Sequence, residues 1–455
     1  MPFHEVVEEW DVGLTAGDPL VFAGYVAPAA DTGESVRTGR CQTYGFIESR
    51  FDVHGGTMGM AAGEKVVRAY ERARLMGLPM VLVTRTGGAR VQEGMLALAQ
   101  LARTAGAARR HAQAGLLSVG VYGSPTTGGV LASYGSLVDI RAAHANAVIG
   151  FAGPRVAEAT LGERMPTGSH SARSLYDHGL LDALLEAHTE PAWVEVALGM
   201  RDEGLPARPL PTVAEPEDAG AWGEVLRARA PGRPSGIDRA ARLCSSWTEL
   251  RSSDATVRAG LATVAGGRCV VVATDRYQAE GHPTPAGYRL AQRAVALAGR
   301  LGLPLVTLVD TPGADPSPES EADGIGLEIA RTFATLDACP TPVVSVCVGE
   351  GGSGGALALS HADRLLICEH AIFSVIGPEG AAAILERDAS KAPQMAEQLK
   401  LTSHDLVGLG IADAVVGETP TAFRDAVVRA LNDAVAGDRK RRLDTATERW
   451  LREEA

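Results

Sequence analysis

The sequence predicts two copies of one layered α/β domain, joined in tandem. Three blocks of the 455-residue chain occur twice, in the same order and about 225 residues apart. The matched pairs are Leu78-Pro79 with Leu303-Pro304 (offset 225), Gly128-Gly129 with Gly354-Gly355 (offset 226) and Gly153-Pro154 with Gly377-Pro378 (offset 224). This register indicates a duplicated domain, because solenoid repeats have periods of only about 20–50 residues.

Each copy repeats an apolar strand, a glycine-rich turn and a helix. Residues 343–348 read VVSVCV, which is typical of a strand buried on both faces. The glycines within 349–355 permit a tight turn and leave backbone N–H groups uncovered by any Cβ. Residues 356–365 are rich in alanine and leucine and predict a helix. Strands that alternate with helices predict a parallel sheet with right-handed crossovers.

Composition shifts suggest the domain boundaries. We expect a first domain over 1–202, a linker over 203–235 that is rich in proline, glutamate and glycine, and a second domain over 236–455. A short helix is possible at 221–230 within the linker. The mixed-charge segment 437–455 predicts a solvated terminal helix.

Bulk properties exclude several classes of function. A net charge of −12 argues against a nucleic-acid partner, which favours a basic surface. No run of 18 apolar residues predicts a membrane span, and the acidic N-terminus lacks the apolar core of a signal peptide. The six cysteines form no C-x-x-C pair, so we expect them to be reduced. Together these features predict a cytoplasmic protein.

The matched glycine pairs are the best candidates for chemistry. Gly128-Gly129 and Gly354-Gly355 each lie between a predicted strand and a predicted helix. Backbone N–H groups at such a position have no intrahelical acceptor and carry partial positive charge. They can stabilise an oxyanion, and two turns could stabilise two oxyanions in one reaction. The alternative is that these glycines only serve tight turns.

Two sharper motifs overlap the second pair but are absent from the first copy. Residues 351–355 fit the G-x-S-x-G elbow of serine hydrolases, and 349–354 fit the G-x-G-x-x-G dinucleotide motif. The first copy keeps only the glycine pair, so both readings rank below the oxyanion interpretation. The histidines are scattered and no phosphate-binding loop motif is present, so we expect no metal site and no loop-bound ATP.

Several longer motifs resemble a known family. The segments TGGARVQEG (86–94), SPTTGGV (124–130) and IGFAGPRVAEAT (149–160) resemble the carboxyltransferase β subunit of bacterial acetyl-CoA carboxylase. The segments that resemble its α subunit are HPTPAGYRLAQRAVALA (282–298), DTPGADP (310–316), GEGGSGGALA (349–358), FSVIGPEGAAAIL (373–385) and 391–416. The likeness covers about 45–190 and 255–418. It implies a β–α fusion with two tandem crotonase-like domains of the ClpP-type β-β-α spiral.

The resemblance also implies a reaction, in which a carboxyl group passes from carboxybiotin to the α-carbon of an acyl-CoA, most simply acetyl-CoA. The family's chemistry needs charge on the thioester oxygen and on the biotin ureido oxygen. By carry-over, Gly128 and Gly129 hold the first oxygen, and Gly354, Gly355 and Ala356 hold the second. The implied substrate-binding residues are Gly87, Gly88, Ala89, Gly153, Pro154, Gly313, Leu357, Ala358 and Gly377. A biotin-independent decarboxylase or hydrolase of a malonyl-type thioester is the alternative, and a scaffolding subunit is a further one.

The resemblance implies partners as well. None of the four lysines is flanked by methionine as a biotin-bearing lysine is, so a separate biotin carboxyl carrier protein and a biotin carboxylase are expected. A homodimer or homohexamer is expected from the family. The chain departs from the β subunit in three respects: no zinc ribbon precedes Gly45, Arg85-Thr86 stands before the first glycine turn where that subunit has small residues, and Ser124 replaces the aspartate expected before Pro-Thr. In the α-like half, TDRYQAEGH (274–282) replaces a lysine-rich stretch. The last two changes leave another acyl thioester open as the substrate.

Overall fold

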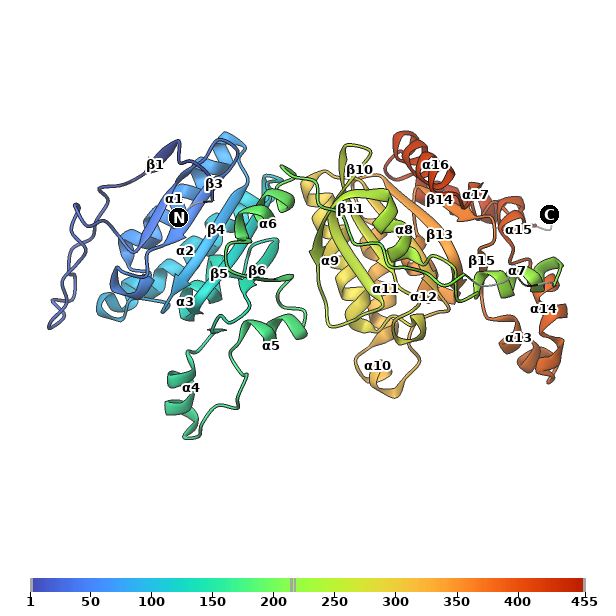
Figure 1. The fold of residues 1–455 in the computed structure, drawn as a ribbon, viewed down its shortest axis with the longest axis horizontal. Coiled ribbons are helices and arrows are strands. Elements are labelled where there is room, and N and C mark those ends of the chain that lie inside the picture. Colours follow the sequence, from blue (N-terminus) through green and yellow to red (C-terminus); the bar gives the residue numbers. More distant parts are fainter. Residues whose placement is uncertain (1–2, 213–215, 217, 453–455) are drawn as a thin grey trace. The chain divides into compact units, whose positions relative to one another are not determined.

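The computed structural model describes residues 3–212, 216 and 218–452. The chain divides into two compact units, Met1–Arg201 and Asp202–Ala455. Each unit contains one eight-stranded sheet with helices packed against it (Figure 1). The predicted α/β class with two repeated domains is confirmed.

The sheet of unit 1 begins antiparallel and continues parallel. Its order is β1-β2-β3-β4-β5-β6-β8, β7 pairs with the end of β5, and pairing is parallel from β3 onward. The central strands are apolar runs because both of their faces are buried. The strands are β1 (Glu8–Trp10), β2 (Val36–Arg40), β3 (Gly45–Ser49), β4 (Met80–Thr86), β5 (Ser118–Thr127), β6 (Ile140–His144), β7 (Ile149–Gly150) and β8 (Ala183–Leu185).

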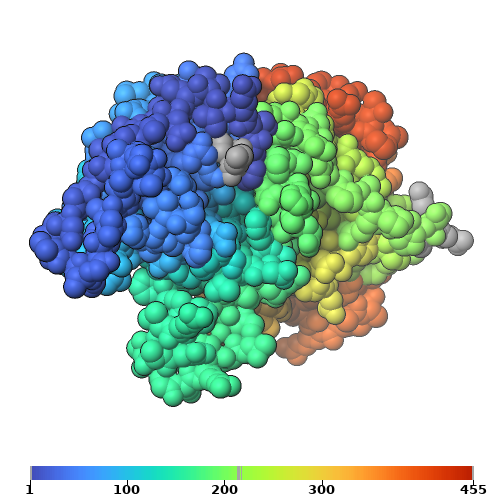
Figure 2. Space-filling view, turned by 60° about the vertical axis from the view of Figure 1, so that its left-hand side comes forward, coloured from blue at the N-terminus to red at the C-terminus, as the bar shows by residue number. Residues whose placement is uncertain are grey.

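Helices cover both faces of this sheet. On α1, Ala62, Val66 and Ala69 follow helical spacing and pack with Leu82 of β4. On the other face, α6 packs Val194 beside strand residues of β4 and β5. None of the residues of α4 is buried, and this helix projects from the rest of unit 1 (Figure 1 and Figure 2). The helices are α1 (Met60–Met76), α2 (Gly94–Gln113), α3 (Gly128–Val130), α4 (Pro154–Leu161), α5 (Ala172–Asp177) and α6 (Glu190–Ala197).

Unit 2 repeats the same sheet plan. Its order is β16-β14-β13-β12-β11-β10-β9, with β15 paired to the end of β13 and with parallel pairing from β11 onward. The strands are β9 (Cys244–Leu250), β10 (Val257–Val264), β11 (Gly267–Thr274), β12 (Leu305–Thr311), β13 (Val343–Gly352), β14 (Arg364–Cys368), β15 (Ile372–Ser374) and β16 (Ala414–Val416).

The helices of unit 2 flank this sheet. The helix α9 packs against α11, β10 and β11, whereas α8 packs against β11 and β12. The helices α7, α13 and α14 pack together beside β15, and α16 packs against β13 and β16 (Figure 1). The helices are α7 (Gly220–Ala228), α8 (Gly236–Leu243), α9 (Pro285–Leu301), α10 (Pro318–Ala322), α11 (Ile325–Asp337), α12 (Ser353–Ser360), α13 (Pro378–Leu385), α14 (Ala392–Leu399), α15 (Ser403–Gly408), α16 (Pro420–Asp433) and α17 (Asp438–Glu448).

The two sheets match in detail. In unit 1, Met80 pairs with Ser118, and the register between β4 and β5 shifts between Thr84 and Thr86. In unit 2, Leu305 pairs with Val343, and the register between β12 and β13 shifts between Val309 and Thr311. The four positions named in unit 1 correspond to the four named in unit 2 at the offset of 225, so the duplication extends to an irregularity of the ladder.

Three expectations about segments need correction or comment. The helix predicted over 356–365 ends at Ser360, and β14 begins at Arg364, because the second half of that run joins the sheet. The terminal helix α17 is not simply solvated: the fully buried Arg439 pairs with the fully buried Asp363 at 3.1 Å. The segment 203–235, expected as a linker, is part of unit 2, where α7 packs against β13, β15 and α14; residues 213–215 and 217 of it lie outside the described residues.

Candidate active site

The first glycine turn lies where β5 ends and α3 begins. Gly128 has a φ of 64°, a left-handed conformation that glycine adopts without strain. Its N–H donates to the carbonyl of Phe151 at 2.9 Å, so this N–H is already used. Gly129 follows in the first helical turn, where a backbone N–H has no intrahelical acceptor. The free donor of this turn is therefore the N–H of Gly129 rather than that of Gly128.

The loop after β4 lies directly against this turn. A Cβ at Gly88 would lie 3.0 Å from Cα of Gly128 and 3.1 Å from N of Gly129, so only glycine allows this approach. Gly88 also has a φ of 106°, and its N–H donates to Oγ1 of Thr86 at 2.9 Å. The neighbouring Ala89 N–H has no acceptor among the described residues. The loop and the helix start thus place two unpaired N–H groups in one turn.

A buried ion-pair cluster holds this loop in place. Arg90, directly after Ala89, is 1% exposed and pairs with Glu34 and with Glu93, the latter at 2.9 Å. Burial is the largest single influence on Arg90 and lowers its pKa, but the hydrogen bonds and charges of Glu34 and Tyr25 together outweigh burial and hold the pKa of the guanidinium above its usual value. Tyr25 donates to Glu93 at 2.8 Å, and burial together with that carboxylate raises the pKa of Tyr25 to about 12.

The second turn repeats this arrangement between β13 and α12. Gly313 has a φ of 138°, and its N–H donates to Oγ1 of Thr311 at 3.1 Å, as Gly88 does to Thr86. A Cβ at Gly355 would lie 2.5 Å from N of Ala314. The N–H of Ala314 has no acceptor among the described residues, and Gly354 is exposed in the first turn of α12. His282 reaches the Gly313 carbonyl with Nδ1 at 3.0 Å.

The structure changes one detail of the predicted duplication. Ser353 begins α12 with a φ of 56°, and Gly128 begins α3 with a φ of 64°, so these two residues are equivalent at the offset of 225. Gly129 therefore corresponds to Gly354, not to Gly355 as the glycine pairs suggested. Gly355 corresponds to Val130 and serves close packing against Ala314.

The other predicted site residues are placed differently. Gly153 precedes α4, which begins at Pro154, and Gly377 precedes α13. Each of these helices follows a short strand, β7 or β15, that pairs with the end of the strand leading into the glycine turn. Ala356 and Ala358 are fully buried within α12, so their side chains pack in the interior, and Leu357 is half-buried. In unit 1 the structure therefore brings the loop 87–89 against the helix start at 128–129. In unit 2 it brings the loop at Gly313 against residues 352–355.

Sequence reasoning missed Ala314, Ser353 and a buried carboxyl below the second turn. Asp310 is fully buried at the end of β12, and its Oδ1 accepts the N–H of Glu350 at 2.9 Å. Burial raises the pKa of Asp310, although Arg276 and Arg233 lower it in part. Applying the offset of 225 to Ala89 and Gly128 would have identified Ala314 and Ser353, whereas no sequence signal marked Asp310 as buried.

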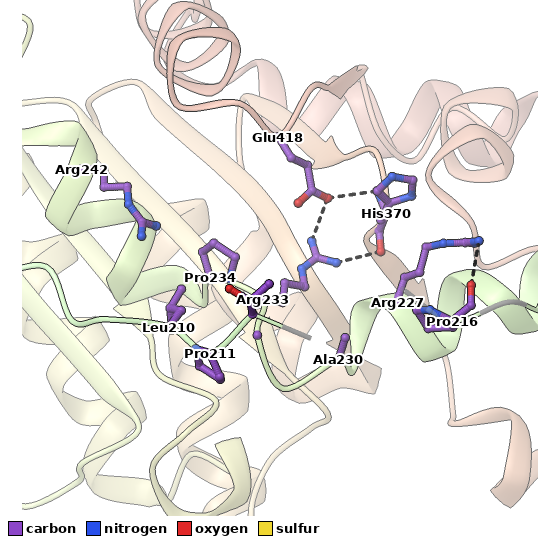
Figure 3. Close-up of a pocket in the computed structure, with 12 residues that line it drawn as sticks. Leu210, Pro211, Pro216, Arg227, Ala230, Arg233, Pro234, Arg242, His370 and Glu418 are labelled. Carbon is purple, nitrogen blue, oxygen red and sulfur yellow. Dashed lines mark hydrogen bonds and ion pairs between the residues drawn. The ribbon is translucent and has the colours of Figure 1, made fainter. Parts of the chain in front are cut away.

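A separate pocket of unit 2, of about 470 Å³, is lined by Arg227, Arg233 and Arg242, and the first two are paired within the protein (Figure 3). Arg233 donates to the carbonyl of His370 at 2.9 Å and pairs with Glu418 at 3.2 Å. Arg227 pairs with Glu224 at 3.1 Å. These contacts explain Arg227 and Arg233 as anchors of the segment before α8.

Within the described residues, no cluster of three His, Cys, Asp or Glu side chains could hold a metal ion, and no helix has the length and apolarity needed to cross a membrane. The six cysteines are buried and unpaired.

Comparisons with known proteins agree with this geometry. A family model described as acetyl co-enzyme A carboxylase carboxyltransferase-like matches residues 217–452, and one described as carboxyl transferase domain matches 28–175. The acetyl-coenzyme A carboxylase carboxyl transferase subunits beta/alpha of Salinispora arenicola are 42% identical over 431 residues, covering 88% of this chain and 75% of that protein. The probable biotin-dependent acyl-coenzyme A carboxylase beta3 subunit of Mycobacterium tuberculosis is 36% identical over 430 residues, covering 91% and 86%. A transcarboxylase 12S structure has a TM-score of 0.76 at 22% identity, covering 97% and 88%.

Two tandem crotonase-like domains, each with a strand-to-helix turn that exposes backbone N–H groups, define an enzyme of the carboxyltransferase class. The chain belongs to the acetyl-CoA carboxylase carboxyltransferase family, with a β-like first unit and an α-like second unit. The predicted family, fold and carboxyltransferase function are confirmed.

Proposed function

We propose that the chain transfers a carboxyl group from biotin on a separate carrier protein to the α-carbon of acetyl-CoA, which yields malonyl-CoA. The observation that carries this proposal is the repetition of one turn in two units at the offset of 225. Transfer places negative charge on two different oxygens, the thioester oxygen of the acceptor and the ureido oxygen of biotin. Two turns with unpaired N–H groups match that requirement.

In unit 1 we assign the thioester oxygen to the N–H groups of Ala89 and Gly129. Gly128 supplies the left-handed bend, and Gly87 and Gly88 keep the loop free of side chains near the oxygen. Each such donor is worth about 2.7–4 kcal/mol in the transition state, because it is oriented before the charge develops.

In unit 2 we assign the ureido oxygen to the N–H groups of Ala314 and Gly354, with Gly355 allowing the close approach of the loop. Carboxybiotin supplies the carboxyl group when its carrier is bound. The exposed position of Gly354 suits a ligand that arrives on another protein. Ser353 bends the backbone at the start of α12, and we assign its hydroxyl no role in the transfer.

The partners follow from the lysines and from the surface. Of the four lysines, Lys65 is buried, and Lys391, Lys400 and Lys440 lack flanking methionines, which supports a separate biotin carboxyl carrier protein and a biotin carboxylase. Exposed apolar side chains gather around α4 and α13, which supports a homo-oligomer such as a dimer or hexamer. They are Phe151, Val156, Leu161, Val375, Ile384 and Leu385. Buried, unpaired cysteines support a cytoplasmic location, and malonyl-CoA as product supports a role in fatty acid biosynthesis.

Reconstitution tests this function. The purified chain is mixed with a biotinylated carrier, biotin carboxylase, ATP, bicarbonate and acetyl-CoA, and malonyl-CoA is quantified. We expect product only when every component is present, and avidin should abolish it by sequestering biotin. A chain that forms no malonyl-CoA but carboxylates propionyl-CoA or a longer acyl-CoA would overturn acetyl-CoA as the acceptor. No carboxylation of any acyl-CoA by the folded chain would overturn the proposal.

A further inference from the structure

The carbonyl behind each loop N–H donor accepts a hydrogen bond in both units, but from different donors. The N–H of Ala89 belongs to the same peptide unit as the carbonyl of Gly88, and the N–H of Ala314 to that of Gly313. Because a peptide unit is planar and trans, its C=O and N–H groups point in opposite directions. A donor that fixes the carbonyl therefore also fixes the direction of the N–H.

In unit 1 this donor is a backbone group. The N–H of Met58 donates to the carbonyl of Gly88 at 2.8 Å. The carbonyl of Met58 in turn accepts the N–H of Arg90 at 2.9 Å, so the segment at Met58 pairs with the chain on both sides of Ala89. The peptide between Gly88 and Ala89 is thus held by the backbone alone.

Unit 2 has the same pairing but lacks that donor. At the offset of 225, Met58 corresponds to Pro283. The N–H of Asp315 donates to the carbonyl of Pro283 at 2.9 Å. This bond is the counterpart of the one that the Met58 carbonyl accepts, so the structure confirms the correspondence. Proline has no N–H, and the carbonyl of Gly313 therefore has no backbone donor at this position.

A side chain replaces the missing donor. His282, the residue before Pro283, has its Nδ1 at 3.0 Å from the carbonyl oxygen of Gly313. A carbonyl oxygen only accepts, so we assign the donated proton to Nδ1. The hydroxyl of Thr311 also lies 3.0 Å from this oxygen, but it has a single proton and lies closer, at 2.7 Å, to the carbonyl of Gly281. His282 is therefore the main donor to the Gly313 carbonyl.

The counterpart of His282 in unit 1 has no such task. At the offset of 225 this position is Thr57, whose hydroxyl donates to the carbonyl of His54 at 2.7 Å. The carbonyl of Gly88 already has the N–H of Met58. The histidine thus occurs in the unit in which proline has removed the backbone donor.

We propose that His282 is a positioning residue of the second turn, whose Nδ1–H replaces the absent backbone donor and directs the N–H of Ala314 toward the ureido oxygen of biotin. The inference rests on the proposed function, which assigns that oxygen to Ala314 and Gly354. Linked hydrogen bonds polarise one another, so donation to the Gly313 carbonyl also makes the Ala314 N–H a stronger donor. His282 acts through this peptide, and we assign it no contact with biotin.

Restoring the donor in two independent ways tests this inference. Release of the carboxyl group from malonyl-CoA in the presence of biocytin is measured for wild type, His282→Thr, His282→Asn and the double variant His282→Thr/Pro283→Ala. The control is His404→Thr, because His404 is an exposed histidine of α15 outside the turn. His282→Asn keeps a side-chain N–H near the place of Nδ1, and Pro283→Ala returns the backbone N–H that unit 1 has at Met58.

The variants should separate by whether they carry a donor. We expect His282→Thr to lower kcat by about 10-fold, near the upper limit for one hydrogen bond, at an unchanged KM for malonyl-CoA. His282→Asn and the double variant should stay within about 3-fold of wild type, because each supplies a donor to the Gly313 carbonyl. A merely structural role would lower the unfolding midpoint of His282→Thr, and Pro283→Ala would not repair it.

The outcomes against the inference are distinct from those against the proposed function. A kcat of His282→Thr equal to that of wild type would overturn the inference. An equal loss in all three variants would also overturn it, since a donor to the Gly313 carbonyl would then make no difference. A wild-type chain that releases no carboxyl group in the presence of biocytin would overturn the proposed function, and the inference with it.

Discussion

Gly128 and Ser353 occupy the same position in the two units, each as the first residue of a helix, with φ angles of 64° and 56°. The next residues, Gly129 and Gly354, therefore present equivalent backbone N–H groups. In both units a loop from the preceding parallel strand closes on this helix start, and each loop supplies a second N–H, from Ala89 or from Ala314. Two sites of one geometry can thus stabilise charge on two different oxygens.

Replacement of Gly88 by alanine should impair transfer through the first turn. The added Cβ would lie 3.0 Å from Cα of Gly128, and the φ of 106° is strained for alanine, so the loop must move away from α3. We expect kcat to fall by about 100- to 1,000-fold, the effect of losing one oriented donor, while circular dichroism stays unchanged. Gly17→Ala is the control, because its Cβ would meet nothing within 4 Å. Similar kcat values for both variants would contradict the assignment.

Replacement of Gly355 by alanine should impair the second turn by a packing effect. Its Cβ would lie 2.5 Å from N of Ala314 and 2.8 Å from the hydroxyl of Tyr288, so the Ala314 N–H must be displaced. We expect a loss of kcat of about 100-fold or more. The control is Gly408→Ala in α15, where a Cβ meets nothing within 4 Å. An unaffected kcat in Gly355→Ala would show that the loop position does not matter for transfer.

Removal of the Ser353 hydroxyl should have little effect. The left-handed backbone at Ser353 meets the geometry of a nucleophile elbow, but we assign catalysis to N–H groups rather than to this side chain. Ser353→Ala keeps the backbone donors, so malonyl-CoA formation should remain within about 3-fold of wild type, a change of less than 1 kcal/mol. A loss of about 1,000-fold in steady-state assays would identify Ser353 as a nucleophile instead.

Asp310→Asn should change how stability depends on pH. Burial raises the pKa of Asp310 above 3.8, so between 3.8 and the folded-state pKa the native protein binds more protons than the unfolded chain. The stability contributed by the protonated carboxyl is lost as pH rises through that window. The unfolding free energy of Asp310→Asn relative to wild type should therefore increase with pH from about 4 upward and then level off. Urea unfolding at a series of pH values measures it, and a pH-independent difference would refute the assignment.

The sequence was sufficient for the duplication, the fold class and the location of both turns, because strand periodicity and glycine-rich turns are local features. The sequence was misleading at Gly355. Matching the two glycine pairs aligned Gly129 with Gly355, whereas the constant offset of 225 aligns Gly128 with Ser353 and Gly129 with Gly354. The positive φ of Ser353 could not be predicted either, because residues other than glycine rarely adopt it.

The central claim is that two turns act as separate oxyanion sites, one for the acyl thioester and one for biotin. The release of the carboxyl group from malonyl-CoA, followed with and without free biocytin, measures both turns in one reaction. We predict that release requires biocytin and falls by about 100-fold or more in both Gly88→Ala and Gly355→Ala. Release that proceeds without biocytin and survives in Gly355→Ala would contradict the account, because the first turn alone would then act as a decarboxylase.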